Sequence, residues 1–216
     1  MSHYIVDRFN NVFKEVNSKK NNCKIIAVSK TFAYELIEPL LIQGHFHFGE
    51  NKVQEAILKW KGKKNIYQNL QLHMIGKLQT NKVKLAVQLF DYIHSLDNIR
   101  LAEKISLEQK KIEKKLKIFI QVNIGSEAQK SGIYPENLKN FYNECINKFD
   151  LNIIGLMCIP PISKNVKKYF NQMAKLNEDL NLNELSMGMS SDYVEAIESG
   201  ASYVRIGSKI FGDRIK

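Results

Sequence analysis

A lysine that follows a predicted buried strand is the first residue in this chain with clear chemical potential. Lys30 comes directly after the segment 24–29 (KIIAVS), whose apolar run is typical of a buried strand in a parallel sheet. Ligand sites of α/β folds lie at the C-terminal ends of such strands. Burial lowers a lysine pKa from its free value of about 10.4, and a neutral amine can attack an aldehyde to form a Schiff base. A surface lysine that merely flanks a strand is the alternative interpretation.

Glycines and hydroxyl side chains follow two later predicted strands and could bind an anion. Ser186 belongs to the segment 185–190 (LSMGMS), while Gly207 and Ser208 follow the strand predicted over 203–206. Glycine lets the backbone approach an anion, hydroxyls donate hydrogen bonds, and helix N-termini present free N–H groups. Barrels often bind phosphate with the loops after their seventh and eighth strands. The alternative is ordinary turn and helix-capping chemistry.

A Schiff-base lysine opposite a phosphate cradle indicates one cofactor. Pyridoxal 5′-phosphate carries an aldehyde at one position and a phosphate at another. If Lys30 and the segment around Gly207 lie on the same face of the fold, they could hold the two ends of this molecule. The sequence therefore predicts a pyridoxal phosphate site.

Two other patterns suggest chemistry less strongly. His45 and His47 lie two residues apart, so they share one strand face and could bind a metal, but no third ligand stands nearby at a suitable spacing. Gly76-Lys77 resembles the end of a phosphate-binding P-loop, but Gln71 occupies the position where that motif requires glycine. We therefore expect neither a metal site nor a P-loop.

Strand-like and helix-like segments alternate along the chain. Strands are predicted over residues 24–29, 45–49, 72–76, 92–96, 116–124, 153–159, 184–187 and 203–206. Helices are predicted over residues 34–43, 50–60, 81–89, 98–114, 135–149, 163–180 and 192–199, with an additional N-terminal helix over 3–18. A helix after each of the first seven strands implies a parallel sheet with right-handed crossovers.

Eight such units imply an α/β fold of the (β/α)8 TIM-barrel type. The 216 residues suffice for one core and are few for two domains of about 150 each, so we expect residues 1–216 to form a single domain. A doubly wound open sheet is the alternative, and it usually carries a glycine-rich dinucleotide turn after its first strand. The corresponding segment here, 29–32 (SKTF), has no glycine, which favours the barrel.

Composition and charge limit the possible partners. Apolar residues make up 44% of the chain and charged residues 25%, as in soluble globular proteins. The net charge of +10 could indicate nucleic-acid binding, but nearly all the cations are lysines, spread through the chain with many asparagines and isoleucines, which is typical of a codon bias toward A and T. No apolar run approaches the ~20 residues of a membrane span. We therefore expect neither nucleic acid nor membrane as a partner.

The cysteines and the N-terminal segment indicate a cellular compartment. Cys23, Cys145 and Cys158 are far apart and odd in number, which favours free thiols in a reducing environment over a disulfide framework or a zinc site. The first ten residues have no basic segment followed by an apolar core, so they do not match a signal peptide. A cytoplasmic location is therefore expected.

Several stretches match one family in order over nearly the whole chain. They are AVSKT (27–31), FGEN (48–51) with VQE (53–55), HMIG (73–76) with LQ (78–79) and NK (81–82), HSLD (94–97), QVN (121–123) with KSG (130–132), GLM (155–157), LSMGMS (185–190) and VRIGSKIFG (204–212). With these stretches the chain resembles the pyridoxal-phosphate homeostasis proteins, single-domain relatives of the alanine racemase N-terminal barrel. One stretch alone would be weak evidence, but the ordered series is specific.

The resemblance implies roles for individual residues. Lys30 would carry the cofactor as a Schiff base, and Asn51 would line the pocket beside its ring. The phosphate would be bound by three residues, which are Ser186, Gly207 and Ser208. Arg205 would face the pyridine nitrogen, which keeps that nitrogen unprotonated and makes the ring a weaker electron sink.

The chain departs from the family pattern at a few positions. The family often continues Ser-Lys-Thr with Lys-Pro, whereas this chain has Phe32 and Ala33, so a second lysine is missing there. Lys77 stands where the family is often uncharged, and a longer basic tail is absent. These departures put in doubt any part of those positions in cofactor transfer.

The sequence favours a carrier over an enzyme. An alanine racemase needs a second acid–base group opposite its lysine, and its relatives supply a tyrosine from a separate domain across a dimer. Only a short segment follows residue 206, no tyrosine is an evident opposing base, and we expect a monomer. We therefore predict a protein of intracellular vitamin B6 homeostasis that binds pyridoxal phosphate reversibly, with cofactor-dependent apo-enzymes as candidate partners. A small racemase-like enzyme and a nucleic-acid-binding barrel are the alternatives.

Overall fold

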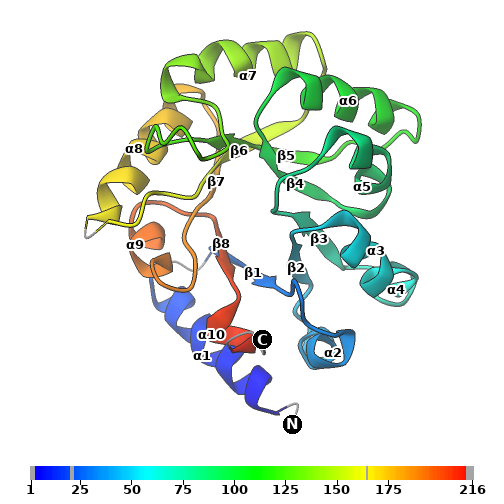
Figure 1. Ribbon diagram of the computed structural model, residues 1–216. Coiled ribbons are helices and arrows are strands. Elements are labelled where there is room, and N and C mark those ends of the chain that lie inside the picture. Colours follow the sequence, from blue (N-terminus) through cyan, green and yellow to red (C-terminus); the bar gives the residue numbers. More distant parts are fainter. Residues whose placement is uncertain (1–2, 20–21, 164, 213–216) are drawn as a thin grey trace.

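A closed barrel of parallel strands forms the centre of the protein (Figure 1). The computed structural model describes residues 3–19, 22–163 and 165–212. Within these residues, eight strands follow one another around the barrel in chain order, and β8 pairs with β1 to close it. The strands are β1 (Lys24–Val28), β2 (His47–Glu50), β3 (Gln71–Met74), β4 (Tyr92–Leu96), β5 (Lys117–Val122), β6 (Ile153–Cys158), β7 (Glu184–Ser186) and β8 (Tyr203–Ile206). The predicted (β/α)8 barrel is confirmed.

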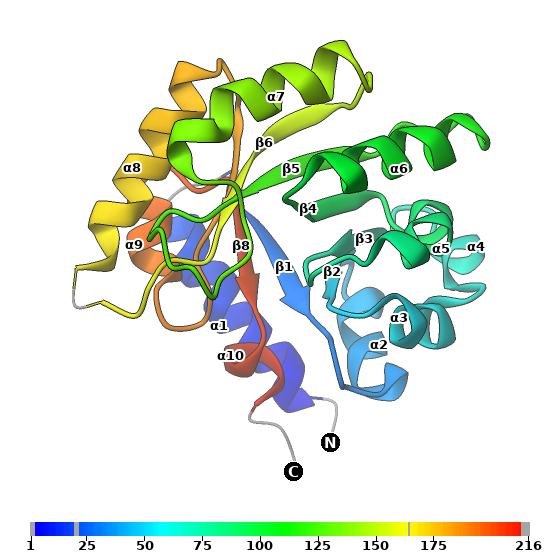
Figure 2. The same ribbon diagram turned by 45° about the horizontal axis from the view of Figure 1, so that its top comes forward.

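Helices cover the outside of the barrel, as the tilted view in Figure 2 shows. They are α1 (His3–Lys19), α2 (Tyr34–Ile42), α3 (Val53–Trp60), α4 (Lys63–Ile66), α5 (Val83–Leu89), α6 (Ile99–Lys110), α7 (Leu138–Asn147), α8 (Val166–Asp179), α9 (Tyr193–Glu198) and α10 (Ser208–Phe211). Short 3-10 turns, η1 (Thr80–Lys82) and η2 (Pro135–Asn137), precede α5 and α7. The short helices α4 and α10 were not predicted, because one helical turn is too short to show a periodic pattern. The two 3-10 turns lie at the starts of the helices predicted over 81–89 and 135–149.

Several predicted helix boundaries are wrong. The α-helices predicted to begin at residues 135 and 163 begin at Leu138 and Val166. The helix predicted over 50–60 begins only at Val53, because Glu50 still pairs with β3 in the ladder of the sheet. The helix predicted over 98–114 ends at Lys110. Boundaries of this kind depend on tertiary pairing that a local pattern does not contain.

The N-terminal helix α1 packs along the barrel wall beside the end of the described chain. Its buried residues Ile5, Phe9, Val12 and Val16 recur at a spacing of three or four, as on one face of an amphipathic helix. This face contacts α2, α9 and α10, so the predicted additional helix covers the region where β1 and β8 close the barrel (Figures 1 and 2).

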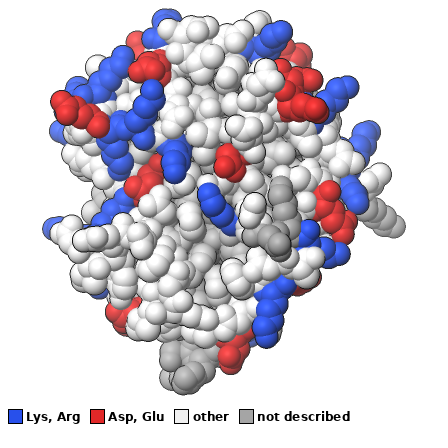
Figure 3. Space-filling view, turned by 180° about the vertical axis from the view of Figure 1, so that it is seen from behind, with Lys and Arg blue, Asp and Glu red and all other residues white. Residues whose placement is uncertain are grey.

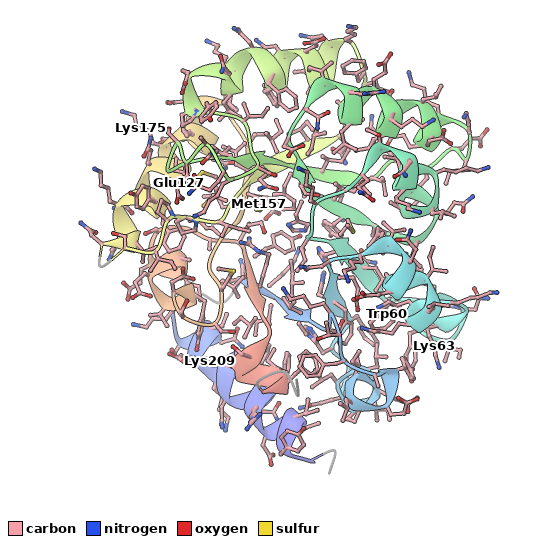
Figure 4. All side chains as sticks on the ribbon, in the orientation of Figure 1. Trp60, Lys63, Glu127, Met157, Lys175 and Lys209 are labelled. Carbon is pink, nitrogen blue, oxygen red and sulfur yellow. The ribbon has the colours of Figure 1, made fainter. Side chains whose placement is uncertain are left out.

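Aromatic and polar side chains fill the interior of the barrel. Tyr92, Phe119, Met157 and Tyr203 form a buried cluster there with Ile26, and Figure 4 labels Met157 in this interior. Two histidine rings stack on this cluster: His73 lies 4.1 Å from the ring of Tyr92, and His94 lies 4.3 Å from the ring of Phe119. Branched aliphatic side chains usually dominate such interiors, so the histidines are unusual.

These histidines are neutral in the folded protein. Burial, with a contribution from neighbouring cations or histidines, lowers the pKa of His73 and His94 well below the usual 6.5. Burial also lowers the pKa of His47 to about 4 and that of His45 to about 3. The protein therefore has four imidazoles that bind a proton less readily than they would in the unfolded chain, and one of them, His45, packs against Phe9 of α1.

A buried carboxylate joins the ends of β1, β2 and α3. One oxygen of Glu50, Oε1, accepts hydrogen bonds from Ser29 Oγ at 2.7 Å, Lys59 Nζ at 2.9 Å and Trp60 Nε1 at 3.0 Å. Lys59 Nζ also donates to the carbonyl of Ser29 at 2.6 Å. Trp60, labelled in Figure 4, packs against Phe48 with ring centroids 5.0 Å apart. This network fixes Ser29, which directly precedes the predicted cofactor lysine.

Charges of both signs are mixed on the surface. Figure 3 shows basic and acidic side chains interspersed over the face that it presents rather than gathered by sign. Several form exposed pairs, such as Lys52 with Glu55 and Lys148 with Glu144. Among the described residues, no helix has both the length and the apolar character needed to cross a membrane.

We expect Glu50→Ala to lower the free energy of unfolding by about 3–5 kcal/mol, because it leaves the indole N–H of Trp60 buried without its acceptor and the ammonium of Lys59 without its carboxylate partner. Glu55→Ala is a matched control, since its exposed pair with Lys52 contributes about 1 kcal/mol or less. Urea unfolding followed by fluorescence measures both. Equal losses in the two variants would contradict the importance of this network.

The buried histidines predict a stability that falls with acid. Between about pH 6.5 and pH 4 the unfolded chain binds protons that His45 and His47 do not bind in the folded state, so stability decreases as the pH falls through this window. Each histidine contributes up to about 1.4 kcal/mol per pH unit. Removing one in His45→Phe should flatten the pH dependence of the free energy of unfolding, measured in urea, by up to that slope. The same slope in both proteins would refute this assignment.

Candidate cofactor site

A cavity of about 430 Å³ opens at the C-terminal ends of the strands. It is lined by Val28, Lys30, Phe32, Asn51, Ile75, Ile159, Met189, Ser190, Ser191, Arg205, Gly207, Ser208 and Gly212. Its volume is within the usual range for a small-molecule site. Five of the six predicted site residues are in this lining, and the sixth, Ser186, is not.

Lys30 leaves β1 through a strained turn. Ser29 N–H donates to the carbonyl of Gly49 at 3.1 Å, which continues the pairing of β1 with β2 as far as the residue before the lysine. Thr31 then has φ of 68°, in the left-handed region that a β-branched residue rarely adopts. Such strain persists only where neighbouring structure enforces it. The fixed turn directs the half-buried Lys30 toward the cavity rather than along the sheet.

The loops after β7 and β8 form the wall with hydroxyl groups. Ser190 and Ser191 come from the loop before α9, and Gly207 and Ser208 come from the start of α10. The two loops are joined, since Gly207 N–H donates to Ser190 Oγ at 3.3 Å. Asp192, at the N-cap position of α9, accepts a hydrogen bond from the N–H of Met189 at 2.6 Å and does not cap the helix with its side chain. This wall combines hydroxyls, backbone N–H groups and a short extra helix, as in the phosphate sites of many barrels.

Arg205 lies at the floor of the cavity, from the interior face of β8. It is only 5% exposed, and its Nη1 donates to the carbonyl and the hydroxyl of Ser186 at 2.7 and 2.8 Å. Its Nη2 donates to the carbonyl of Cys158 at 2.9 Å. Burial lowers the pKa of Arg205, but the group keeps its charge because an arginine starts so high.

Ser186 occupies a different place from the one the sequence suggested. It is fully buried, and its hydroxyl contacts Arg205 and His94 Nδ1, the latter at 2.9 Å. The reason is the period of the strand: Ser186 ends β7 with its side chain pointing into the barrel, whereas the serines that reach the cavity come after the turn at Gly188. Ser190, the last residue of the 185–190 motif, and Ser191 directly after it line the cavity but were not among the predicted site residues.

Close backbone contact holds Asn51 at the cavity. A Cβ atom on Gly76 would lie 2.3 Å from the carbonyl oxygen of Asn51, so only glycine lets the loops after β2 and β3 approach in this way. Asn51 and Ile75 also border an adjoining cavity of about 340 Å³. Lys77, one of the departures from the family pattern, lines this second cavity.

Phe32, the other departure, has a structural partner. Its ring stacks on Phe211 of α10 with centroids 5.0 Å apart. The pair joins the turn after β1 to the helix after β8, across the line where the barrel closes. At the position where the family often has a lysine, this chain therefore has an aromatic packing contact.

Comparison with known proteins identifies relatives over the whole fold. The family model described as alanine racemase, N-terminal domain, matches residues 6–215. The chain is 37% identical to the pyridoxal phosphate homeostasis protein of Aquifex aeolicus, over 97% of this chain and 95% of that protein. It is 36% identical to the protein of the same name from Haemophilus influenzae, over 93% and 89% of the two chains.

Solved structures agree with this result. The structure of PipY from Synechococcus elongatus with PLP bound has a TM-score of 0.87 and 33% identity, covering 96% of this chain and 100% of that chain. Alanine racemase of Clostridium difficile has a TM-score of 0.74 at 15% identity, which shows a common fold alone. Its chain is longer, since the match covers 99% of this chain but 57% of the racemase. This chain belongs to the alanine racemase N-terminal domain family and, within it, to the pyridoxal phosphate homeostasis proteins.

Proposed function

We propose that this protein binds pyridoxal 5′-phosphate reversibly at the C-terminal cavity and acts as a carrier or buffer in vitamin B6 homeostasis. One observation carries the proposal: a single cavity is lined by an amine, Lys30, a hydroxyl-rich wall after β7 and β8, and Arg205 at its floor. These groups suit an aldehyde, a phosphate and a pyridine nitrogen in turn. The relative PipY, solved with PLP bound, supports the choice of cofactor.

The wall after β7 and β8 would hold the phosphate. The hydroxyls of Ser190, Ser191 and Ser208 can donate to it, as can backbone N–H groups at the start of α10. Among the described residues, the N–H groups of Ser208 and Lys209 have no hydrogen-bond partner, so both are available to an anion. Since the hydroxyl of Ser186 is committed beneath the cavity, we assign the phosphate to Ser190, Ser191, Gly207 and Ser208.

The remaining lining residues would orient the ring. Pyridoxal phosphate supplies an aldehyde that condenses reversibly with an amine, and Lys30 supplies that amine. Arg205 can only donate hydrogen bonds, so a nitrogen facing it must offer a lone pair and stay unprotonated. Asn51 lies beside the cavity between the two ends.

The chemistry of the lining favours holding the cofactor over using it. In the described lining, the titratable side chains are Lys30 and Arg205, and the arginine does not exchange protons near neutral pH. Racemisation needs a second acid–base group on the opposite face of the substrate carbon. A cavity with one such group can bind and release an aldehyde but lacks the pair needed for that reaction.

The oligomeric state and the cellular location are inferred from the fold and the cysteines. We infer a monomer, because the closed barrel leaves no strand edge among the described residues for pairing with another copy. We infer a cytoplasmic protein that delivers its cofactor to pyridoxal phosphate-dependent apo-enzymes. Buried cysteines fit a reducing compartment, and burial raises the pKa of Cys145 and Cys158 to about 12, which keeps them unreactive.

Lys30→Ala should abolish covalent binding of the cofactor. Wild-type protein incubated with pyridoxal phosphate should develop a visible absorbance band, and borohydride should fix the cofactor on the peptide that contains Lys30. Lys77→Ala is the matched control, because Lys77 lines the adjoining cavity, and it should keep the band.

A wild-type protein without any band after incubation would refute the proposal. Label on another lysine in place of Lys30 would refute the assignment of the amine. If the loaded wild-type protein exchanged the α-proton of an amino acid into deuterated water stereospecifically, the racemase-like alternative would replace the carrier.

The double variant Ser190→Ala with Ser208→Ala should weaken pyridoxal phosphate binding by a factor of about 100, since each lost hydrogen bond to a charged group contributes roughly 1.5 kcal/mol or more. Binding of pyridoxal, which has no phosphate, should change little. Ser131→Ala, in the adjoining cavity, is the control. Equal weakening of both ligands in fluorescence titrations would show that these serines do not bind the phosphate.

A further inference from the structure

A continuous line of imidazoles crosses the barrel interior and ends beneath the cofactor cavity. His47 Nδ1 lies 3.0 Å from His73 Nε2, and His73 Nδ1 lies 2.9 Å from His94 Nε2. His94 Nδ1 lies 2.9 Å from Ser186 Oγ, which in turn accepts from Arg205 Nη1 at 2.8 Å. His73, His94 and Ser186 are fully buried.

The geometry of the barrel explains this line. In the strand ladders His47 stands opposite Gln71, two residues before His73, and His73 stands opposite Tyr92, two residues before His94. A step of two residues keeps a side chain on the same face of the sheet, so all three rings point into the barrel. From each strand to the next, the histidine therefore lies two residues nearer the C-terminal end of the barrel. It runs from His47, which borders a cavity at the N-terminal end, toward the C-terminal mouth.

Arg205 determines the direction of the hydrogen bonds. A guanidinium has donors only, so Ser186 Oγ accepts from Arg205 and its own proton is available for His94 Nδ1. A neutral imidazole has one donor and one acceptor. Once His94 Nδ1 accepts, its Nε2–H donates to His73 Nδ1, and His73 Nε2–H donates to His47 Nδ1. Every buried donor and acceptor between the strands is then satisfied.

The reverse direction leaves a buried donor without an acceptor. If His94 donated from Nδ1, Ser186 Oγ would accept from both His94 and Arg205. The hydroxyl proton would then have no acceptor among the described contacts of this fully buried side chain, which is unfavourable. At neutral pH both imidazoles are neutral and each keeps one donor and one acceptor, since the pKa values of His73 and His94 lie well below 6.5.

We propose that His94 and His73 are positioning residues whose oriented hydrogen bonds hold the Ser186 hydroxyl as an acceptor and thereby fix the Arg205 guanidinium at the cavity floor. Two further acceptors on Arg205, the carbonyls of Ser186 and Cys158, define its plane, and the hydroxyl selects one orientation within it. The guanidinium would thus be in place before a ring arrives. The consequence for the cofactor depends on the function proposed above, whereas the direction of the hydrogen bonds along the line of imidazoles is a property of the protein alone.

The direction can be tested in the protein without cofactor. Histidine ¹⁵N spectra at pH 7.5 should show His73 and His94 neutral, with the proton on Nε2 and unprotonated Nδ1. Couplings across the N–H···N bonds should connect His94 to His73 and His73 to His47. A proton on Nδ1 of either ring, or a ring whose pKa is not lowered from its ordinary value, would overturn the proposal whether or not the protein binds pyridoxal phosphate.

The positioning role is tested in the loaded protein with paired variants. His94→Phe should weaken binding of pyridoxal phosphate and pyridoxal alike by about tenfold, and should shift the absorbance of the bound cofactor, because the floor under the ring has lost its order. His94→Gln, which keeps one donor and one acceptor, should restore most of the affinity. His45→Phe is the matched control, since His45 is a part-buried histidine outside the line of imidazoles, and its Nε2 donates to a carbonyl.

A structural role alone predicts another pattern. His94→Phe and His45→Phe would then lower the unfolding midpoint, while the affinity and spectrum of the folded fraction stayed those of the wild type. That outcome would overturn the positioning role. A wild-type protein that bound no cofactor would instead refute the proposed function and leave the tautomer result standing.

Discussion

The guanidinium of Arg205 brings a positive charge into the barrel, and much of the surrounding structure follows from the need to accommodate it. Within the described residues no carboxylate forms an ion pair with it, so carbonyl and hydroxyl oxygens take its protons. A second charge in the same low-dielectric interior would be costly, which is why the nearby imidazoles must be neutral. The interior therefore contains a line of hydrogen-bonded polar side chains among aromatic rings, where most barrels have layers of aliphatic side chains.

Rigid surroundings also explain how a lysine is held in a strained turn. The left-handed Thr31 lies two residues after Ser29, whose backbone and hydroxyl are bound by Gly49, Lys59 and Glu50. Fixing one side of the turn in this way compensates for the unfavourable backbone conformation on the other. The arrangement stabilises the lysine's position at some expense to the local backbone, as is common where a side chain must meet a ligand in one geometry.

The sequence predicted what depends on local pattern and on family motifs. Apolar runs located the strands, and the positions of Lys30, Asn51, Arg205, Gly207 and Ser208 after or within them located the cavity. It misplaced Ser186, because a difference of a few residues along a strand end decides whether a side chain points into the barrel or onto the mouth. Glu50 and the histidines were missed because their partners are distant in sequence. A buried-strand pattern interrupted by one histidine, as at His73 and His94, was the available signal.

The closure of the barrel has a consequence for the life of the growing chain. β1 pairs with β8 from Lys24 opposite Tyr203 to Ala27 opposite Ile206, so the two halves of the cavity come from opposite ends of the described sequence. During synthesis Lys30 leaves the ribosome long before Gly207 and Ser208 exist. Until β8 arrives, β1 is an unpaired strand edge, and Lys30 has no wall from the loop after β8 beside it. The cavity lined by Lys30, Gly207 and Ser208 is therefore complete only once the last strand has paired with the first.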